Sequence, residues 1–100
     1  MERDHVATLI AVTHEPDALK QQIPKETRRE VFCTVSSVQQ SEFFAAGRNG
    51  LRPQMRLKVF AEDYRQEEFV EVDGARYRIY RTYLGDNEQL ELYLEKKAGA

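Results

Sequence analysis

Apolar and polar residues alternate along two stretches in the second half of the chain. Residues 54–61 place an apolar side chain at every second position, with Arg56 and Lys58 between them. Residues 89–96 repeat this pattern with three leucines. A period of two residues is typical of β-strands that have one face in the core and the other in water. Both stretches are therefore predicted to be half-buried strands.

Two further strands are predicted on either side of a tight turn. Residues 68–72 and 76–84 flank Asp73-Gly74, which suits a two-residue hairpin turn because both central positions of that turn need positive φ. Residues 85–88 contain a second set of turn formers and lead into the last strand. The second half of the chain is thus expected to be a meander of four antiparallel strands.

The first half of the chain supplies two more strands, at residues 6–12 and at about residues 30–38. The connection between them contains two prolines, and a structureless loop of that length is unusual in a compact domain. We therefore expect both strands to extend into the connection as a long hairpin arm that turns near residues 17–20.

One short segment, residues 36–47, has the composition of a helix. Ser37, with Gln40 three residues later, forms a capping-box pattern at its start. Gly47 suits the left-handed position that often ends a helix. The following residues, 48–53, contain Asn-Gly and Arg-Pro pairs and are expected to form a loop.

These elements predict a single, mainly β domain, residues 1–100. Six strands and one helix in 100 residues fit a small six-stranded antiparallel barrel or sandwich, with the short helix inserted between the second and third strands. The chain carries 15 Lys and Arg against 17 Asp and Glu, and this balance does not favour a grip on nucleic acid through bulk charge. No apolar run approaches the ~20 residues of a membrane span, and no membrane association is expected.

Candidate catalytic chemistry is sparse. Cys33, His5 and His14 are the only soft metal ligands, and a zinc site would need several carboxylates to complete it. Cys33 lies in an apolar run, where a small buried side chain is the simplest interpretation. The five glycines do not form a phosphate-binding loop, and no Gly-x-Ser-x-Gly motif is present. We therefore expect no catalytic residue, no bound metal, no cofactor and no enzymatic activity.

Several separated blocks of the sequence occur in the order that they have in one known family. They are residues 41–53 (SEFFAAGRNGLRP), 59–64 (VFAEDY), 77–83 (YRIYRTY) and 90–93 (LELY). With these blocks the chain resembles the head closure, or head–tail adaptor, proteins of long-tailed phages and of prophage-like elements in Gram-positive bacteria. Lys20 stands where the family pattern would place a glycine at the tip of the first hairpin.

The resemblance implies a structural, non-enzymatic part of a virion. In such proteins a small β-barrel subunit forms a homo-oligomeric ring below the portal and its adaptor ring, where it seals the DNA exit channel and docks the tail. The implied partners are further copies of the chain, the portal-associated adaptor protein, and a tail or tail-completion protein. Packaged double-stranded DNA would pass through the ring without sequence-specific binding. The implied location is the head–tail junction of the virion, after assembly in the bacterial cytoplasm.

Residues 41–53, which we call the connector segment, are the candidate interface or channel loop. They hold two phenylalanines and two arginines, and aromatic and arginine side chains often anchor protein interfaces. Phe43 and Phe44 are adjacent, so a helix points them about 100° apart. We expect one to cap the barrel core and the other to remain available to a neighbouring subunit. The candidate interface residues are Ser41, Glu42, Phe43, Phe44, Arg48, Asn49, Gly50, Leu51, Arg52 and Pro53, and the candidate turn residues are Asp73 and Gly74.

A nucleic-acid-binding barrel of the OB type is the main alternative. Residues 76–83 alternate aromatic residues with arginines, a pattern that suits the stacking of single-stranded bases. The residues that would share one face of a regular strand are Tyr77, Ile79, Arg81 and Tyr83. Cross-strand ion pairs with Glu68, Glu71 and Asp73 are a simpler interpretation of the arginines. A small hydrolase has less support still, because no nucleophile–base pair can be assembled.

Overall fold

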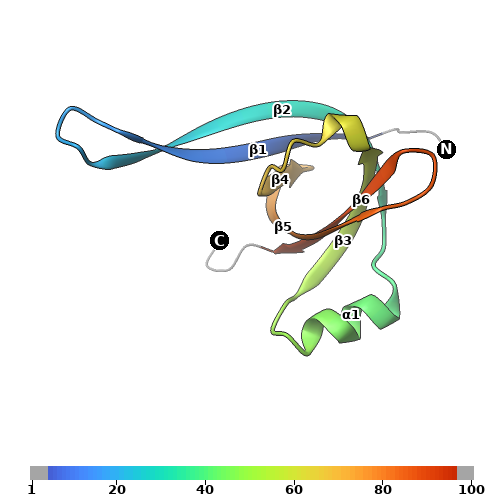
Figure 1. Cartoon of the computed structure of the whole chain (residues 1–100). Helices are drawn as coiled ribbons and strands as arrows, with labels where there is room; N and C mark the ends of the chain where they lie inside the picture. The colour runs from blue at the N-terminus through green and yellow to red at the C-terminus, as the bar shows by residue number, and fades with distance from the viewer. Residues whose placement is uncertain (1–4, 97–100) are drawn as a thin grey trace.

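The fold is mainly β, as the sequence predicts. The computed structural model describes residues 5–96 (Figure 1), and the rest of the predicted domain, residues 1–4 and 97–100, lies outside the described residues. The elements are β1 (His5–Pro16), β2 (Gln22–Ser36), α1 (Gln40–Gly47), β3 (Pro53–Phe60), a short 3₁₀ turn η1 (Ala61–Asp63), β4 (Phe69–Val72), β5 (Ala75–Leu84) and β6 (Gln89–Lys96). Within residues 5–96, no helix is long and apolar enough to cross a membrane.

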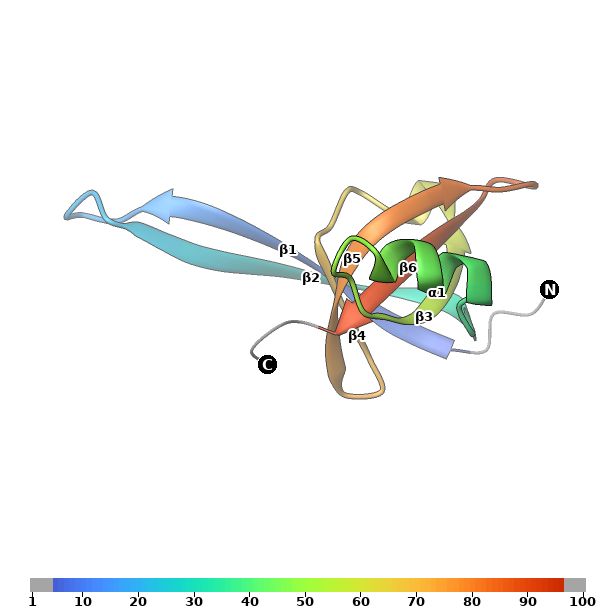
Figure 2. The ribbon, with the colours of Figure 1, turned by 90° about the horizontal axis from the view of Figure 1, so that it is seen from below.

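All six strands join one antiparallel sheet that closes on itself. The strand order is β1–β2–β3–β6–β5–β4, and β4 returns to β1 through the pairs Thr8 with Glu71 and Ile10 with Phe69. We call this closed sheet the barrel. The helix α1 is inserted between β2 and β3 and lies beside the barrel (Figures 1 and 2). The predicted class, six antiparallel strands with a helix between the second and third, is confirmed.

Side chains fill the interior of the barrel. The two-residue alternation of burial holds in β3, where Leu57 and Val59 are fully buried. In β6, Leu92 and Leu94 are fully buried as predicted, but Tyr93 between them is buried as well, because the Arg81 guanidinium covers its ring. Cys33 is fully buried in the same cluster, which confirms the prediction that it is a small core residue. A barrel of this strand number has room only for packed side chains, so nothing the size of a nucleic acid passes through one copy.

A β-bulge changes which residues of β5 face outward. Against β6, Ile79 pairs with Leu94 and Arg81 pairs with Tyr93, so β5 advances two residues while β6 advances one. Tyr80 is the extra residue, and such a bulge reverses the inside–outside alternation beyond it. The prediction that Arg81 shares a face with Ile79 is therefore wrong.

The predicted hairpin arm is present. β1 and β2 pair from His5 with Cys33 to Pro16 with Gln22, whereas β4 and β3 pair only with the parts of this hairpin nearest the barrel. Residues 13–25, which we call the arm, therefore project alone to one side (Figure 1). Asp17 closes the tip, because its Oδ1 accepts hydrogen bonds from the backbone N–H of Leu19 at 2.9 Å and of Gln21 at 2.8 Å. Lys20 has a φ of 62°, a conformation that glycine adopts more readily.

Candidate assembly surface

The connector segment begins with a helix that has no side-chain cap. The N-cap is Gln39, with extended backbone dihedral angles of φ −68° and ψ 151°, and no side chain hydrogen-bonds to the cap. The predicted capping box of Ser37 and Gln40 is therefore wrong. β2 ends at Ser36 and the helix begins at Gln40 after an extended Gln39, so Ser37 comes too early to reach the first N–H groups of the helix.

The helix ends differently from the prediction at Gly47. Gly47 is the last helical residue, Arg48 keeps right-handed helical dihedral angles, and the left-handed residue is Gly50, with a φ of 78°. The N–H of Leu51 then donates to the carbonyl of Ala46 at 3.1 Å. This hydrogen bond ties the loop back to the helix, and the Asn-Gly pair makes the turn in place of Gly47.

Phe43 and Phe44 both face outward. They are 51% and 58% exposed, and their rings meet edge to face with centroids 6.0 Å apart. Only Ala46 of α1 is buried. The prediction that one phenylalanine caps the barrel core is therefore wrong, because the helix buries the small side chain of Ala46 and leaves both rings exposed.

Glu42 attaches the helix to β5. Its carboxylate accepts a hydrogen bond of 2.9 Å from the Tyr80 hydroxyl and one of 2.6 Å from Nη2 of Arg81. The Arg81 guanidinium also lies 4.0 Å from the centre of the Tyr93 ring. This cluster of Glu42, Tyr80, Arg81 and Tyr93, which we call the latch, spans three elements and uses the β5 bulge to bring Tyr80 and Arg81 to the same carboxylate.

The latch shifts the pKa values of its members in opposite directions. Partial burial alone would raise the pKa of Glu42, but the hydrogen bonds from Arg81 and Tyr80 outweigh it and hold that pKa below its ordinary value. Burial, reinforced by the hydrogen bond to the Glu42 carboxylate, raises the pKa of the Tyr80 hydroxyl. Both shifts favour one state, with a charged carboxylate and a neutral phenol. Near neutral pH the Glu42 carboxylate is therefore in the form that accepts the hydrogen bonds from Tyr80 and Arg81.

The remaining predicted interface residues divide into a surface set and a structural one. Ser41, Arg48, Asn49, Gly50 and Arg52 are exposed, and Leu51 is half-buried. Pro53 is buried and begins β3 opposite Glu95, so it belongs to the sheet and not to the surface. A shallow hollow of about 260 Å³ lies between helix and sheet, lined by Glu42, Ala45, Ala46, Asn49, Leu51, Tyr80 and Arg81.

The predicted turn at Asp73 and Gly74 is confirmed. Both residues have positive φ, 52° and 82°, and they connect the paired ends of β4 and β5. The Asp73 carboxylate lies 3.5 Å from Nε2 of His5, across the junction of β1 with the β4–β5 hairpin. This turn therefore fixes a register in the barrel.

The arginines of β5 are paired with carboxylates, but not with the predicted ones. Their partners come from β2, β6 and α1 because the sheet is closed and the bulge redirects Arg81. Glu71, predicted as one of the partners, instead binds Arg28 at 2.9 Å. The pairs are Arg76 with Glu26 at 2.8 Å, Arg78 Nε with Glu95 at 2.6 Å, and Arg81 with Glu42.

No sequence pattern predicts the buried ion pair between Glu67 and Arg29. Glu67 is 4% exposed, and its carboxylate binds Arg29 of β2 at 2.6 Å and the backbone N–H of Arg65 at 2.7 Å. The hydroxyl of Tyr64 donates to the carbonyl of Glu67 at 2.8 Å, and burial together with that carboxylate raises the pKa of Tyr64. These contacts fix the loop before β4 against the barrel. Glu67 and Arg29 are 38 positions apart, and no local pattern connects them.

The part of the chain from His5 to Lys96 contains no group of three or more His, Cys, Asp or Glu side chains that could hold a metal ion. No model of a known protein family matches the chain, and no curated protein is detectably similar to it in sequence. The main surface features of the described chain are the exposed phenylalanine pair on α1, the latch that holds this helix to the sheet, the paired arginines of β5, and the arm.

Proposed function

We propose that the chain is a structural subunit of a phage or prophage particle that forms a ring at the head–tail junction. In this role it closes the DNA exit channel and docks the tail. The observation that carries the proposal is the connector segment, in which two adjacent phenylalanines are half-exposed on a helix that the latch holds against the sheet. An exposed apolar pair with a fixed orientation is suited to bind another protein.

A filled barrel is compatible with this role only if several copies act together. The core cluster occupies the interior of the sheet, so a DNA channel would have to run between copies arranged around an axis. The side chains of Arg76, Arg78 and Arg81 are already paired with carboxylates, and the formal charge is −2. Such a surface would contact DNA without holding its phosphates, as a channel through which DNA slides requires.

The OB-type alternative has weaker support. Base stacking on a strand needs aromatic rings and free cations on one open face. In β5, the bulge places Tyr80 and Arg81 in the latch beneath the helix, where Glu42 binds both. Nothing comparable to a continuous stacking platform remains among the described residues of this strand.

Deletion of the gene from the phage or prophage that carries it tests the proposal. We expect the induced lysate to contain free tails and heads that have lost their DNA, as seen by electron microscopy. A plasmid copy of the wild-type gene should restore tailed particles, and a copy carrying Phe43→Ser and Phe44→Ser should not. The matched control is Phe32→Ser, which removes an exposed phenylalanine from β2 and should restore them. Normal tailed particles after the deletion would overturn the proposal.

A further inference from the structure

Two exposed patches lie at opposite ends of the molecule. The tip of the arm lies at one end of the long axis, and the turn between β5 and β6 lies at the other (Figures 1 and 2). The molecule measures 48 Å along its longest axis and 31 and 23 Å across it. The two patches therefore cannot meet within one chain.

The arm tip presents apolar side chains and one cation. Leu19 is 78% exposed and Ile23 is 49% exposed. Lys20 stands between them at the turn, and within residues 5–96 it has no ion pair. The side-chain hydrogen bonds and ion pairs that the arm makes among the described residues are internal to it, such as Glu15 with Lys25 at 3.8 Å. A lone two-stranded hairpin is only marginally stable in water, so a second surface would stabilise the arm.

The opposite end carries a hollow of complementary character. It has a volume of about 390 Å³, and its lining consists of Ala61, Glu62, Leu84, Gly85 and Glu88. Leu84 is 63% exposed, and Glu62 and Glu88 are exposed carboxylates without an ion pair in the described chain. The Ala61 N–H donates to the Glu88 carbonyl at 2.8 Å, which holds the two sides of the hollow together. We call this site the acidic hollow.

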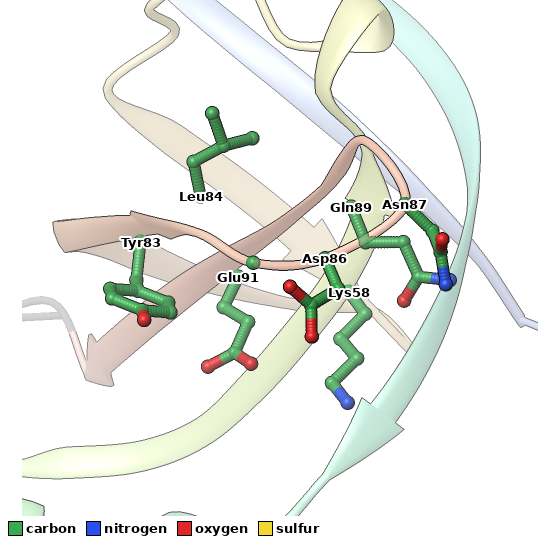
Figure 3. Close-up of a pocket in the computed structure, with 8 residues that line it drawn as sticks. Lys58, Tyr83, Leu84, Asp86, Asn87, Gln89 and Glu91 are labelled. Carbon is green, nitrogen blue, oxygen red and sulfur yellow. The ribbon is translucent and has the colours of Figure 1, made fainter.

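The two sides of the β5–β6 turn differ. Figure 3 shows Lys58, Asp86 and Glu91 together on one side, and Leu84 directed to the other. The side with Lys58 carries charges of both signs, so it selects no particular charge in a partner. The acidic hollow combines a leucine with carboxylates alone.

We propose that the arm tip of one copy of the chain binds in the acidic hollow of the next copy, with Leu19 against Leu84 and Lys20 between Glu62 and Glu88. This inference rests on the proposed function, because it names the contact that would build the ring. The arm projects about 20 Å from the barrel at the usual rise of a strand, far enough to reach across the edge of a neighbouring barrel.

A second copy is the occupant that the geometry favours. Two different patches at opposite ends of one subunit are what a head-to-tail interface requires, and such an interface forms a ring when its rotation closes. Pairing between strand edges is less suited to this contact, because Pro16 and Pro24 each remove a backbone donor from the arm. Side-chain complementarity of apolar and charged groups remains as the means of recognition.

Charge reversal on the full-length protein tests this contact. We expect Lys20→Glu, or Glu62→Lys together with Glu88→Lys, to weaken self-association at least about tenfold in sedimentation velocity. A chain that carries all three changes restores the complementarity and should regain most of the affinity. The matched controls are Lys25→Glu on the arm and Asp86→Lys on the other side of the turn, which should leave association unchanged. Equal effects of test and control variants would overturn the inference.

Cysteine cross-linking gives a second measurement that does not depend on affinity. The double variant Leu19→Cys with Leu84→Cys is treated with a short bismaleimide in two samples. One is the purified protein at high protein concentration, and the other is assembled particles that contain the variant. We expect a ladder of covalent oligomers, and only monomers from each single variant. Cross-links of residue 19 to a different protein of the particle, or no links between copies in either sample, would overturn the inference.

The two proposals fail in different ways. A ladder between copies, together with normal tailed particles after gene deletion, would support the arm contact and overturn the head–tail function. Loss of tailed particles after deletion, with no ladder, would support the function and overturn the arm contact.

Discussion

The hydroxyl of Tyr80 donates a hydrogen bond of 2.9 Å to the carboxylate of Glu42, which lies 38 positions earlier in the chain. Through this contact and the adjacent Arg81, a short helix with one buried residue keeps a fixed orientation on the sheet. An eight-residue helix is too short to be stable by itself in water. The latch therefore accounts for the orientation of Phe43 and Phe44, which the helix presents to solvent.

Glu42→Gln is expected to weaken the latch in a pH-dependent way. At neutral pH it should lower the free energy of unfolding by about 1 kcal/mol, a modest value because Arg81 is 42% exposed and solvent screens the pair. The pKa of Glu42 is lowered in the folded protein, so its stabilisation is present above the ordinary carboxyl pKa and is lost as the pH falls through the folded-state value. The difference in unfolding free energy between wild type and variant should therefore stay constant near neutral pH and shrink as the pH falls below the ordinary carboxyl pKa of about 4.3.

Urea denaturation of both proteins across this pH range measures the effect. Glu62→Gln serves as the matched control, because Glu62 is exposed and has no ion pair among the described residues. A difference that is the same at every pH would show that the lowered pKa of Glu42 makes no contribution to stability.

Glu67→Ala should destabilise the fold far more than loss of a surface carboxylate. The substitution leaves the Arg65 N–H without its acceptor and Arg29 without its ion pair, with only its hydrogen bond to the Asp63 carbonyl, and breaking comparable pairs costs about 3 kcal/mol. Glu15→Ala, which removes an exposed pair with Lys25, should change the unfolding free energy by less than about 0.5 kcal/mol. Denaturant midpoints with unchanged slopes give both values, and equal effects would contradict the structural role of Glu67.

Phe43→Ala and Phe44→Ala are each expected to cost less than about 1 kcal/mol of stability, because both rings are half-exposed. Leu57→Ala, a fully buried leucine, provides the contrast and should cost about 2–5 kcal/mol. Thermal melts of the three variants distinguish these values. A large loss for either phenylalanine would mean that the helix packs more deeply than the structure places it.

The elements that sequence pattern predicts well are those with a local cause. The alternation around Leu57 and the turn at Asp73 depend on neighbouring residues, and both are confirmed. The errors arise where distant parts of the chain decide the outcome. At the Tyr80 bulge, Arg81 and not Tyr80 pairs with Tyr93, which changes the face on which Arg81 lies. This register depends on β5 and β6 together and not on either strand alone.

The same distinction explains the candidate site. The family resemblance and the composition of the connector segment predict an interface, but its orientation depends on the contact of Glu42 with residues of a β5 bulge that no local pattern indicates. Packing of Ala46, rather than of a phenylalanine, is likewise a tertiary result, since the larger side chain would ordinarily be expected inside.

Nucleic-acid binding by the isolated protein should be weak. The arginines of β5 are paired, so we expect no binding to short single strands at micromolar concentrations and physiological salt in a fluorescence titration. A variant with Glu26→Gln and Glu95→Gln unpairs Arg76 and Arg78 and should bind more tightly, with a steeper dependence on salt. Tight binding by the wild type would favour the OB-type alternative.

The arm should be dispensable for folding but not for self-association. Its hydrogen bonds and ion pairs among the described residues are internal, so its backbone amides should exchange with deuterium far faster than those of the buried residues Leu9 and Ile10. Replacing residues 13–25 with Asn-Gly keeps Val12 opposite Glu26, and therefore keeps the pair of Glu26 with Arg76. The shortened protein should retain its near-ultraviolet circular dichroism and its melting temperature, and lose association in sedimentation velocity. Unfolding of the shortened protein, or association equal to that of the wild type, would show that the arm serves the barrel of its own chain and not a neighbour.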